Sequence, residues 1–208
     1  IPYTVSLPPA EPRVLPPGAP FTILSVGRLV ERKGNDVLLR ALALLQPKVP
    51  GARVVIVGDG PERARLESLA AELGVRDAVD FRGRVSDDEL RRAYRESSVF
   101  ALPAIVDARG DTEGLGVVLL EAMNYAVPVV ASAAGGIVDV VEDGASGLLL
   151  PPGDATALAD ALERLANDEA LAVRLGAGGR ERLRTRFTWE SIVGRWRAIY
   201  EEVAAGRA

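Results

Sequence analysis

The sequence predicts an α/β fold, namely a doubly wound, Rossmann-like parallel sheet with helices on both faces. Expected strands and helices alternate about six times along the chain. The expected strands are continuous apolar runs, such as RVVIV at residues 53–57, instead of alternating apolar and polar residues. Such strands are buried on both faces, which is typical of a parallel sheet between two helical layers. Ligands of this sheet type bind beyond the carboxyl ends of the strands, so we expect the functional residues just after each strand.

The expected strands are short, β-rich apolar segments. They lie at residues 21–26, 53–57, 79–81, 99–102, 128–132 and 147–150. Helical periodicity predicts the segments between and after them as helices, at residues 35–48, 61–73, from 86 onward, 117–125, 137–141 and 155–166. Pro61 suits a first helical position, and Ser86 can form a capping box with Glu89. Asp154 is expected to cap the helix that follows it.

The end of the chain is expected to be helical over residues 170–205. A loop is predicted near residues 176–179, where glycines gather, and a break is predicted at Phe187 and Thr188.

The domain organisation is expected to be simple. Residues 1–20 contain seven prolines, so they are predicted to form an extended linker. The chain has 208 residues, of which 48% are hydrophobic, enough for one sizeable core. The expected parts are a Pro-rich linker, a Rossmann-like domain and a C-terminal helix, at residues 1–20, 21–187 and 188–208. Because the chain starts at Ile1 instead of Met, we expect it to be a fragment of a longer polypeptide.

Composition excludes several kinds of chemistry. The chain has no His and no Cys, which excludes disulfides, imidazole or thiolate metal sites, Cys nucleophiles and a His base. Its net charge is −4, so no global charge attracts nucleic acid or an acidic membrane surface. No apolar run approaches the roughly 20 residues of a membrane span. Carboxylates, Arg, Lys and backbone groups must therefore carry the function.

Two cations follow the first expected strand, in the stretch GRLVERKG at residues 27–34. Arg28 and Lys33 flank a turn that leads into a helix, and a helix amino terminus with two cations suits a diphosphate. Gly27 and Gly34 would let the backbone approach a ligand closely. The alternative is that both cations are solvated loop charges.

The second expected strand is followed by GDGPER at residues 58–63. This stretch invites comparison with the dinucleotide fingerprint G-x-G-x-x-G of dehydrogenases, but Arg63 occupies the third glycine position. The next strand ends at Phe81 and is followed by Arg82 instead of an acidic residue. A dehydrogenase is therefore disfavoured, and a structural turn is the favoured interpretation of these glycines.

The third expected strand is followed by RGRVSDDE at residues 82–89. A nucleotide base could lie against Gly83 and Arg84 and accept a hydrogen bond from the backbone of Val85. A glycine turn before a capped helix explains the stretch equally well.

The stretch EGLGVVLLEAM, residues 113–123, carries a carboxylate at each end of an apolar run. Gly114 and Gly116 suit a sharp turn before a helix amino terminus, whose free N–H groups favour a phosphate. Eight residues of helix span roughly 12 Å, so Glu113 and Glu121 cannot both hold one metal ion. We expect Glu121 to accept hydrogen bonds from a ribose and Glu113 from a sugar. The alternative makes Glu113 a partner of the helix dipole and Glu121 a solvated residue.

Taken in order, these stretches resemble one family. GRLVERKG, VGDGPER, FRGRV, EGLGVVLLEAM, PVVAS with GGIVDVVEDGASGLLLPPGD, and FTWESIVGRW resemble the carboxyl-terminal domain of family 4 retaining glycosyltransferases. The resemblance covers residues 21 to about 203. Tyr3 and Thr4 depart from the family's usual entry into this domain, a departure that concerns only the linker.

The resemblance implies a B-type fold of two Rossmann-like domains, in which this chain is the second and binds a UDP- or GDP-sugar. It implies catalytic roles for Arg28 and Lys33 at the diphosphate and for Glu113 at the donor sugar. It implies donor binding by the backbone of Val85 at the base and by Glu121 at the ribose. The turn formed by Gly114, Leu115, Gly116 and Val117 would lie beside the diphosphate, and Asp87 could discriminate guanine from uracil. No cofactor and no metal are implied.

The resemblance also implies partners and a location. The amino-terminal, acceptor-binding domain of the same polypeptide would receive the C-terminal helix, and the fragment alone is expected to be inactive. We expect a cytoplasmic protein, with peripheral association at the inner face of a membrane as an alternative, because family acceptors are often lipid-linked. Two other functions stay open: a non-catalytic nucleotide-sugar-binding module and a sugar-nucleotide epimerase-like domain.

Overall fold

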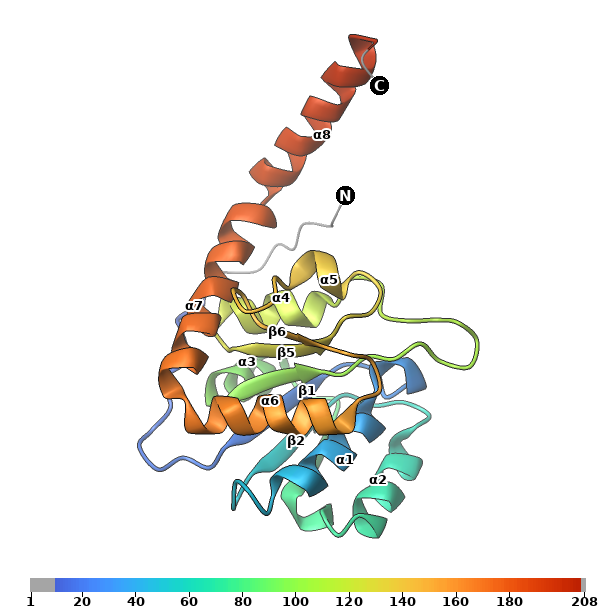
Figure 1. Ribbon diagram of the computed structural model, residues 1–208, viewed down its shortest axis with the longest axis vertical. Helices are drawn as coiled ribbons and strands as arrows, with labels where there is room; N and C mark the ends of the chain where they lie inside the picture. Colours follow the sequence, from blue (N-terminus) through green and yellow to red (C-terminus); the bar gives the residue numbers. More distant parts are fainter. Residues whose placement is uncertain (1–9, 207–208) are drawn as a thin grey trace.

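The computed structural model describes residues 10–206 and contains a six-stranded sheet in the order β3-β2-β1-β4-β5-β6 (Figure 1). Every neighbouring pair of strands is parallel. The strands are β1 (Thr22–Val26), β2 (Arg53–Val57), β3 (Val79–Gly83), β4 (Val99–Leu102), β5 (Val129–Ser132) and β6 (Leu148–Leu150). The predicted doubly wound parallel sheet is therefore confirmed.

Helices cover both faces of this sheet. They are α1 (Asn35–Leu45), α2 (Arg63–Glu72), α3 (Asp87–Glu96), α4 (Val117–Asn124), α5 (Ile137–Val140), α6 (Ala155–Asn167), α7 (Glu169–Arg186) and α8 (Trp189–Ala204). Short 3-10 helices, η1 (Glu31–Lys33) and η2 (Arg76–Ala78), precede α1 and β3. The apolar residues of α1, α2 and α6 join one core cluster, and those of α3, α4 and α5 join the other.

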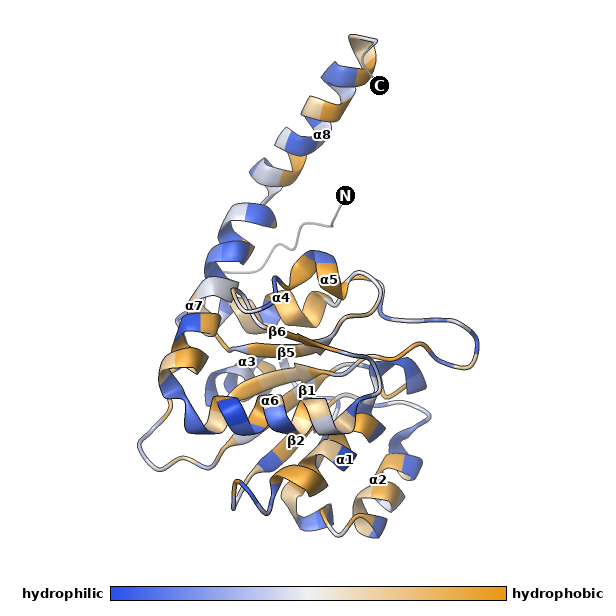
Figure 2. Ribbon diagram, viewed as in Figure 1, coloured by the Kyte–Doolittle hydropathy of each residue, from blue (hydrophilic) through white to orange (hydrophobic). Residues whose placement is uncertain are grey.

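Successive residues of a strand belong to different core clusters. Ile23 belongs to the cluster on one face and Leu24 to the cluster on the other, and Val54 and Val55 alternate in the same way. Successive side chains of a strand point to opposite faces, so a strand between two helical layers is mostly apolar on both faces. The hydrophobic colouring of the strands in Figure 2 reflects this requirement.

The strand order creates a switch point between β1 and β4. Strand β1 pairs with β2 on one side and with β4 on the other, so the connections after β1 and β4 leave toward opposite faces. In open α/β sheets, ligands bind in the crevice beyond the carboxyl ends of such strands. The loops at residues 27–34 and 103–116 leave the sheet at this switch point.

The described part of the Pro-rich segment, residues 10–20, contains no helix or strand and is fastened to the domain. The backbone N–H of Arg13 donates to the carbonyl of Tyr125 at 2.8 Å. The guanidinium of Arg13 donates to the carbonyl of Ser97 at 3.2 Å, and Arg180 donates to the carbonyl of Ala10 at 2.6 Å. The remainder of the predicted linker, residues 1–9, lies outside the described residues.

The predicted loop near residues 176–179 is wrong, because α7 runs through it without interruption. A Cβ atom on Gly176 would lie 2.2 Å from the carbonyl oxygen of Ala126, and one on Gly178 would lie 2.0 Å from that of Ala145. These glycines therefore let a helix touch the backbone of neighbouring loops. The predicted break at residues 187–188 is confirmed, since Thr188 caps the separate helix α8.

Helix α8 extends away from the sheet and its helical layers (Figure 1). Apolar and hydrophilic residues alternate along it (Figure 2), and Trp189 and Tyr200 are 62% and 67% exposed. No helix within residues 10–206 is long and apolar enough to cross a membrane.

We predict that Gly176→Ala lowers the free energy of unfolding by about 1–3 kcal/mol, because the added methyl group overlaps the carbonyl of Ala126. Helix propensity alone predicts the opposite sign, since Ala favours a helix over Gly. Urea denaturation measures the difference. Gly194→Ala in α8 is the matched control, because a Cβ atom there meets nothing within 4 Å; an equal effect of both changes would contradict the packing argument.

Candidate functional site

The loops after β1, β2 and β3 are joined by backbone contacts. The N–H of Leu29 donates to the carbonyl of Asp59 at 3.0 Å, and the N–H of Gly58 donates to the carbonyl of Gly83 at 2.7 Å. A Cβ atom on Gly58 would lie 1.9 Å from the carbonyl oxygen of Gly27. Gly58 therefore has a packing role, because it lets two loops meet backbone to backbone.

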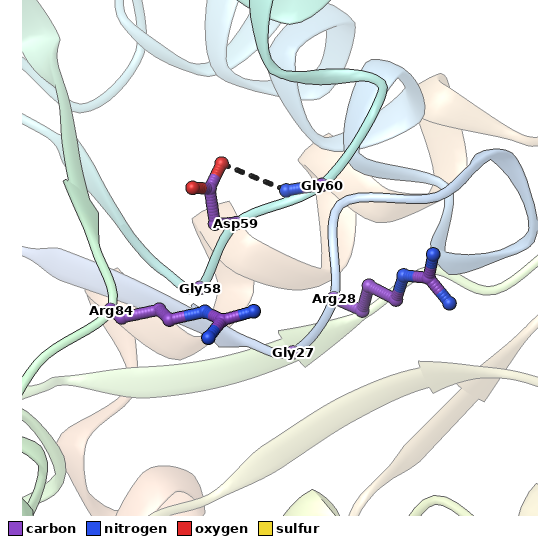
Figure 3. Close-up of a pocket in the computed structure, with 6 residues that line it drawn as sticks. All are labelled: Gly27, Arg28, Gly58, Asp59, Gly60 and Arg84. Atoms are coloured by element: carbon purple, nitrogen blue, oxygen red, sulfur yellow. Dashed lines mark hydrogen bonds between the residues drawn. The ribbon is translucent and has the colours of Figure 1, made fainter.

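A pocket of about 550 Å³ opens among these loops. It is lined by Gly27, Arg28, Gly58, Asp59, Gly60 and Arg84 (Figure 3). The guanidinium of Arg84 lies near Gly27, whereas the side chain of Arg28 extends away from Arg84 (Figure 3). The carboxylate of Asp59 accepts a hydrogen bond from the N–H of Gly60 at 2.8 Å. Two exposed guanidinium groups at the edge of one pocket suit a ligand that carries negative charge.

An ion pair crosses the switch point between the loops after β1 and β4. Lys33 Nζ lies 2.7 Å from Glu113 Oε2, and each side chain is only 13% exposed. The other oxygen of this carboxylate, Oε1, accepts a hydrogen bond from the backbone N–H of Gly116 at 3.1 Å. Two predicted site residues from different loops therefore meet directly, at the amino-terminal end of a helix.

The turn that precedes α4 is shaped by glycines. Gly116 has a left-handed backbone, with φ of 72°, and no side chain caps the helix, which begins at Val117. Behind this turn, a Cβ atom on Gly135 would lie 2.0 Å from the carbonyl oxygen of Glu113. A Cβ atom on Gly136 would lie equally close, 2.0 Å, to the carbonyl oxygen of Gly114. The Gly135–Gly136 pair thus fixes where residues 113–116 run.

Glu121 lies in the second turn of α4 and is half-buried. Its Oε2 accepts a hydrogen bond from the hydroxyl of Tyr94 in α3 at 2.7 Å. Burial raises the pKa of Tyr94, and the charge of Glu121 raises it further. Tyr94 therefore acts as the donor in this bond.

The residues expected near a base lie where α3 begins. Ser86 caps the helix, with its hydroxyl accepting from the N–H of Glu89 at 3.3 Å, so the predicted capping box is confirmed. Val85 is half-buried against the core, and Asp87 is exposed in the first turn of α3. Their roles at a base stay predictions.

The structure brings some predicted residues together and leaves others apart. Lys33, Glu113 and Gly116 form one group, Arg28 lines the pocket, and Glu121 contacts Tyr94. Within residues 10–206, no group of three or more carboxylates is placed to hold a metal ion.

Sequence reasoning missed Asp59 and Tyr94, and it treated Arg84 only as a neighbour of the base. Asp59 and Arg84 line the pocket, and Tyr94 holds a predicted site residue. A signal existed for Tyr94, because a tyrosine on the buried face of a helix needs a partner for its hydroxyl. The partner itself lies 27 residues away and has no local signature.

Residues 10–182 match the protein-family model described as glycosyl transferases group 1. The chain belongs to this family. Within it, the chain corresponds to the carboxyl-terminal domain of the B-type glycosyltransferase fold, as its motifs suggested.

Several proteins are similar to this domain. It is 39% identical, over 84% of its length, to the GDP-mannose-dependent alpha-(1-6)-phosphatidylinositol monomannoside mannosyltransferase of Mycobacterium tuberculosis, of which it covers 46%. The sucrose-phosphate synthase structure from Thermosynechococcus elongatus has a TM-score of 0.73 and 34% identity, covering 98% of this chain and 50% of that one. Anabaena Alr3699/HepE in complex with UDP and glucose has a TM-score of 0.74 and 26% identity, covering 89% and 48%. The chain spans about half the length of these relatives.

Proposed function

We propose that this chain is the donor-binding half of a retaining glycosyltransferase that transfers a hexose from a nucleotide diphosphate sugar to a glycan or lipid-linked acceptor. The observation that carries the proposal is the Lys33–Glu113 ion pair at the switch point, in which Glu113 also accepts a hydrogen bond from the N–H of Gly116. A cation and a helix-terminal N–H, side by side beyond the ends of parallel strands, are the groups that bind a diphosphate.

The carboxylate of Glu113 stands in for a phosphate in this arrangement. Its two oxygens accept from Lys33 and from Gly116, as two oxygens of a phosphate would. On donor binding, the diphosphate would take over these donors, with Val117 N–H beside them, and Arg28 would approach from the pocket. Glu113 would then turn to the hydroxyls of the donor sugar, to which a carboxylate makes charged hydrogen bonds of about 1.5–3 kcal/mol each.

The reaction would break the bond between the anomeric carbon and the diphosphate oxygen. It would form a bond from that carbon to an acceptor hydroxyl oxygen on the same face of the sugar, and the hydroxyl proton would pass to the departing diphosphate. Its transition state is like an oxocarbenium ion and places negative charge on the departing phosphate. Arg28, Lys33 and the N–H groups at the start of α4 would stabilise that charge more than they stabilise the ground state. In this proposal they take the place of a metal ion at the diphosphate.

The base is proposed to lie at the start of α3, with Val85 as its backbone contact and Asp87 as its exposed carboxylate. A carboxylate can accept from the N–H groups of guanine, which uracil does not offer in the same arrangement. The name of the mycobacterial relative specifies GDP-mannose, which favours a guanosine donor here. A uridine donor is the alternative, since HepE was crystallised with UDP.

The acceptor-binding half is proposed to cover the apolar residues of α8. Trp189, Trp196 and Tyr200 are exposed on this projecting helix, and the chain spans about half the length of its relatives. Half of the cleft would thus come from elsewhere in a longer polypeptide, and the 208 residues alone should not turn over. Peripheral membrane association of the complete enzyme would follow from a lipid-linked acceptor, such as the mycobacterial relative's name describes.

A thermal-shift panel of UDP-, GDP- and ADP-sugars tests the donor-binding function. A donor at about 100 times its Kd stabilises the folded form by about 2.7 kcal/mol, which corresponds to a rise in Tm of about 5–10 °C for a domain of this size. We expect such a rise only with the sugars of one nucleotide base, and we expect GDP-mannose to be among them. No rise with any member of the panel would overturn the proposal.

We predict that Arg28→Ala or Lys33→Ala lowers kcat/KM by about 100-fold or more in an active enzyme that contains this domain, because each removes positive charge from the departing diphosphate. Steady-state kinetics at varied donor concentration measures the loss. Arg40→Ala is the matched control, since Arg40 is exposed on α1 and outside the proposed site. Undiminished turnover would remove Arg28 or Lys33 from the mechanism.

In this proposal Glu121 accepts a hydrogen bond from the ribose hydroxyls. Glu121→Ala is therefore predicted to weaken binding of the nucleoside diphosphate by about 10- to 100-fold, the loss expected for one charged hydrogen bond. Isothermal titration calorimetry on the 208-residue chain measures the affinity. Glu72→Ala, an exposed carboxylate change at the end of α2, should leave affinity unaltered. Equal affinity of Glu121→Ala and the unaltered chain would count against the ribose contact.

A further inference from the structure

The hydroxyl of Tyr94 joins helices α3 and α4 at Glu121. The donor–acceptor distance is 2.7 Å, and the two residues lie 27 positions apart in the sequence. Glu121 is the carboxylate that the proposed function assigns to the ribose, so the bond connects a donor-binding group to a second helix. Its role follows from how firmly each partner is held.

Tyr94 is held firmly. Its side chain is only 2% exposed, and its ring stacks on Tyr125 with centroids 5.4 Å apart and an interplanar angle of 7°. The ring of Phe100 lies against it, with centroids 5.9 Å apart. A buried phenol retains its proton when burial and a nearby carboxylate both oppose its ionisation, and both act on Tyr94. The hydroxyl is therefore a donor fixed in place by ring packing.

Glu121 is held at one oxygen only. Oε2 accepts from Tyr94, whereas within residues 10–206 the other oxygen, Oε1, has no hydrogen-bond partner. The side chain is half-buried, so Oε1 can still be reached by a ligand. A free glutamate has several rotatable bonds, and ordering such a side chain on binding costs about 0.5–1.5 kcal/mol. A contact that orders it beforehand removes that cost from ligand binding.

We infer that Tyr94 is a positioning residue for the nucleotide site, which fixes Glu121 so that its free oxygen faces the ribose hydroxyls of a nucleoside diphosphate. The inference rests on the proposed function, in which Glu121 accepts from the ribose. Tyr94 does not touch the ligand and acts through Glu121 alone. A purely structural hydroxyl would affect stability, whereas a positioning hydroxyl also affects how strongly the site distinguishes a ribose from a deoxyribose.

Tyr94→Phe tests this difference, because it keeps the ring and removes only the hydroxyl. The readout is the ratio of calorimetric Kd values for a 2′,3′-dideoxynucleoside diphosphate and the matching ribonucleoside diphosphate, with GDP and UDP as probes. We expect a ratio well above one for the 208-residue chain and a ratio about 3- to 10-fold smaller for Tyr94→Phe, corresponding to the ordering cost of one side chain. Tyr125→Phe is the matched control, since it removes a hydroxyl from the stacked ring without touching the bond to Glu121, and its ratio should match that of the unaltered chain.

The outcomes separate the inference from the proposed function. A ratio near one in the unaltered chain would overturn the ribose contact of Glu121 and the role of Tyr94 with it. A high ratio that Tyr94→Phe leaves unaltered would overturn the role of Tyr94 alone. An equal fall of the ratio in Tyr94→Phe and Tyr125→Phe would also overturn it, because a general loosening of the aromatic stack would then be the cause.

A crystal structure of the unaltered chain with GDP or UDP gives a test that needs no variant, should Tyr94→Phe fail to fold. We expect the Tyr94 hydroxyl to stay on one oxygen of Glu121 while the other oxygen accepts from the ribose. Glu121 rotated away from Tyr94 to reach the ribose would overturn the inference.

Discussion

The site depends on one constraint, the reversal of strand order between β1 and β4. Because β1 pairs with β4, the loops that leave β1 and β4 come together although they are far apart in sequence. Lys33 belongs to one loop and Glu113 to the other, and their ion pair joins the two loops. Both side chains are nearly buried, and an unpaired charge in such a place would be costly. Glu113 therefore lets the domain fold with Lys33 at the switch point without leaving a nearly buried charge unpaired.

Backbone packing sets the geometry around this ion pair. Gly34 brings the first loop against the carbonyl of Pro103, since a Cβ atom would lie 1.8 Å from its oxygen. Gly135 does the same for the carbonyl of Glu113. Both glycines have positive φ, which other residues adopt at a cost. A site built from backbone contacts of this kind places its N–H groups with little freedom, as binding a diphosphate by helix-terminal amides requires.

The sequence predicted the features that have local causes. The mostly apolar strands, the capping box at Ser86 and the N-cap at Asp154 all appear where their patterns lie. The prediction of a loop at the glycines of α7 was wrong because these glycines are required by a long-range contact. Gly176 packs against the carbonyl of Ala126, and sequence periodicity gives no sign of that contact. The bond between Tyr94 and Glu121 was missed for the same reason, since the fold alone brings those two helices together.

Arg63 shows why a glycine-rich turn after a strand need not bind phosphate. In the dinucleotide fingerprint, the third glycine lets a helix approach the sheet closely. Here Arg63 instead extends to donate to the carbonyl of Phe81 at 3.1 Å and thereby ties α2 to the next strand. Gly60 meets the neighbouring loop, where a Cβ atom would lie 2.3 Å from the carbonyl oxygen of Leu29. The turn after β2 thus serves loop packing, which favours the helix start after β4, where Lys33 and the Gly116 N–H both contact Glu113, as the proposed place for a diphosphate.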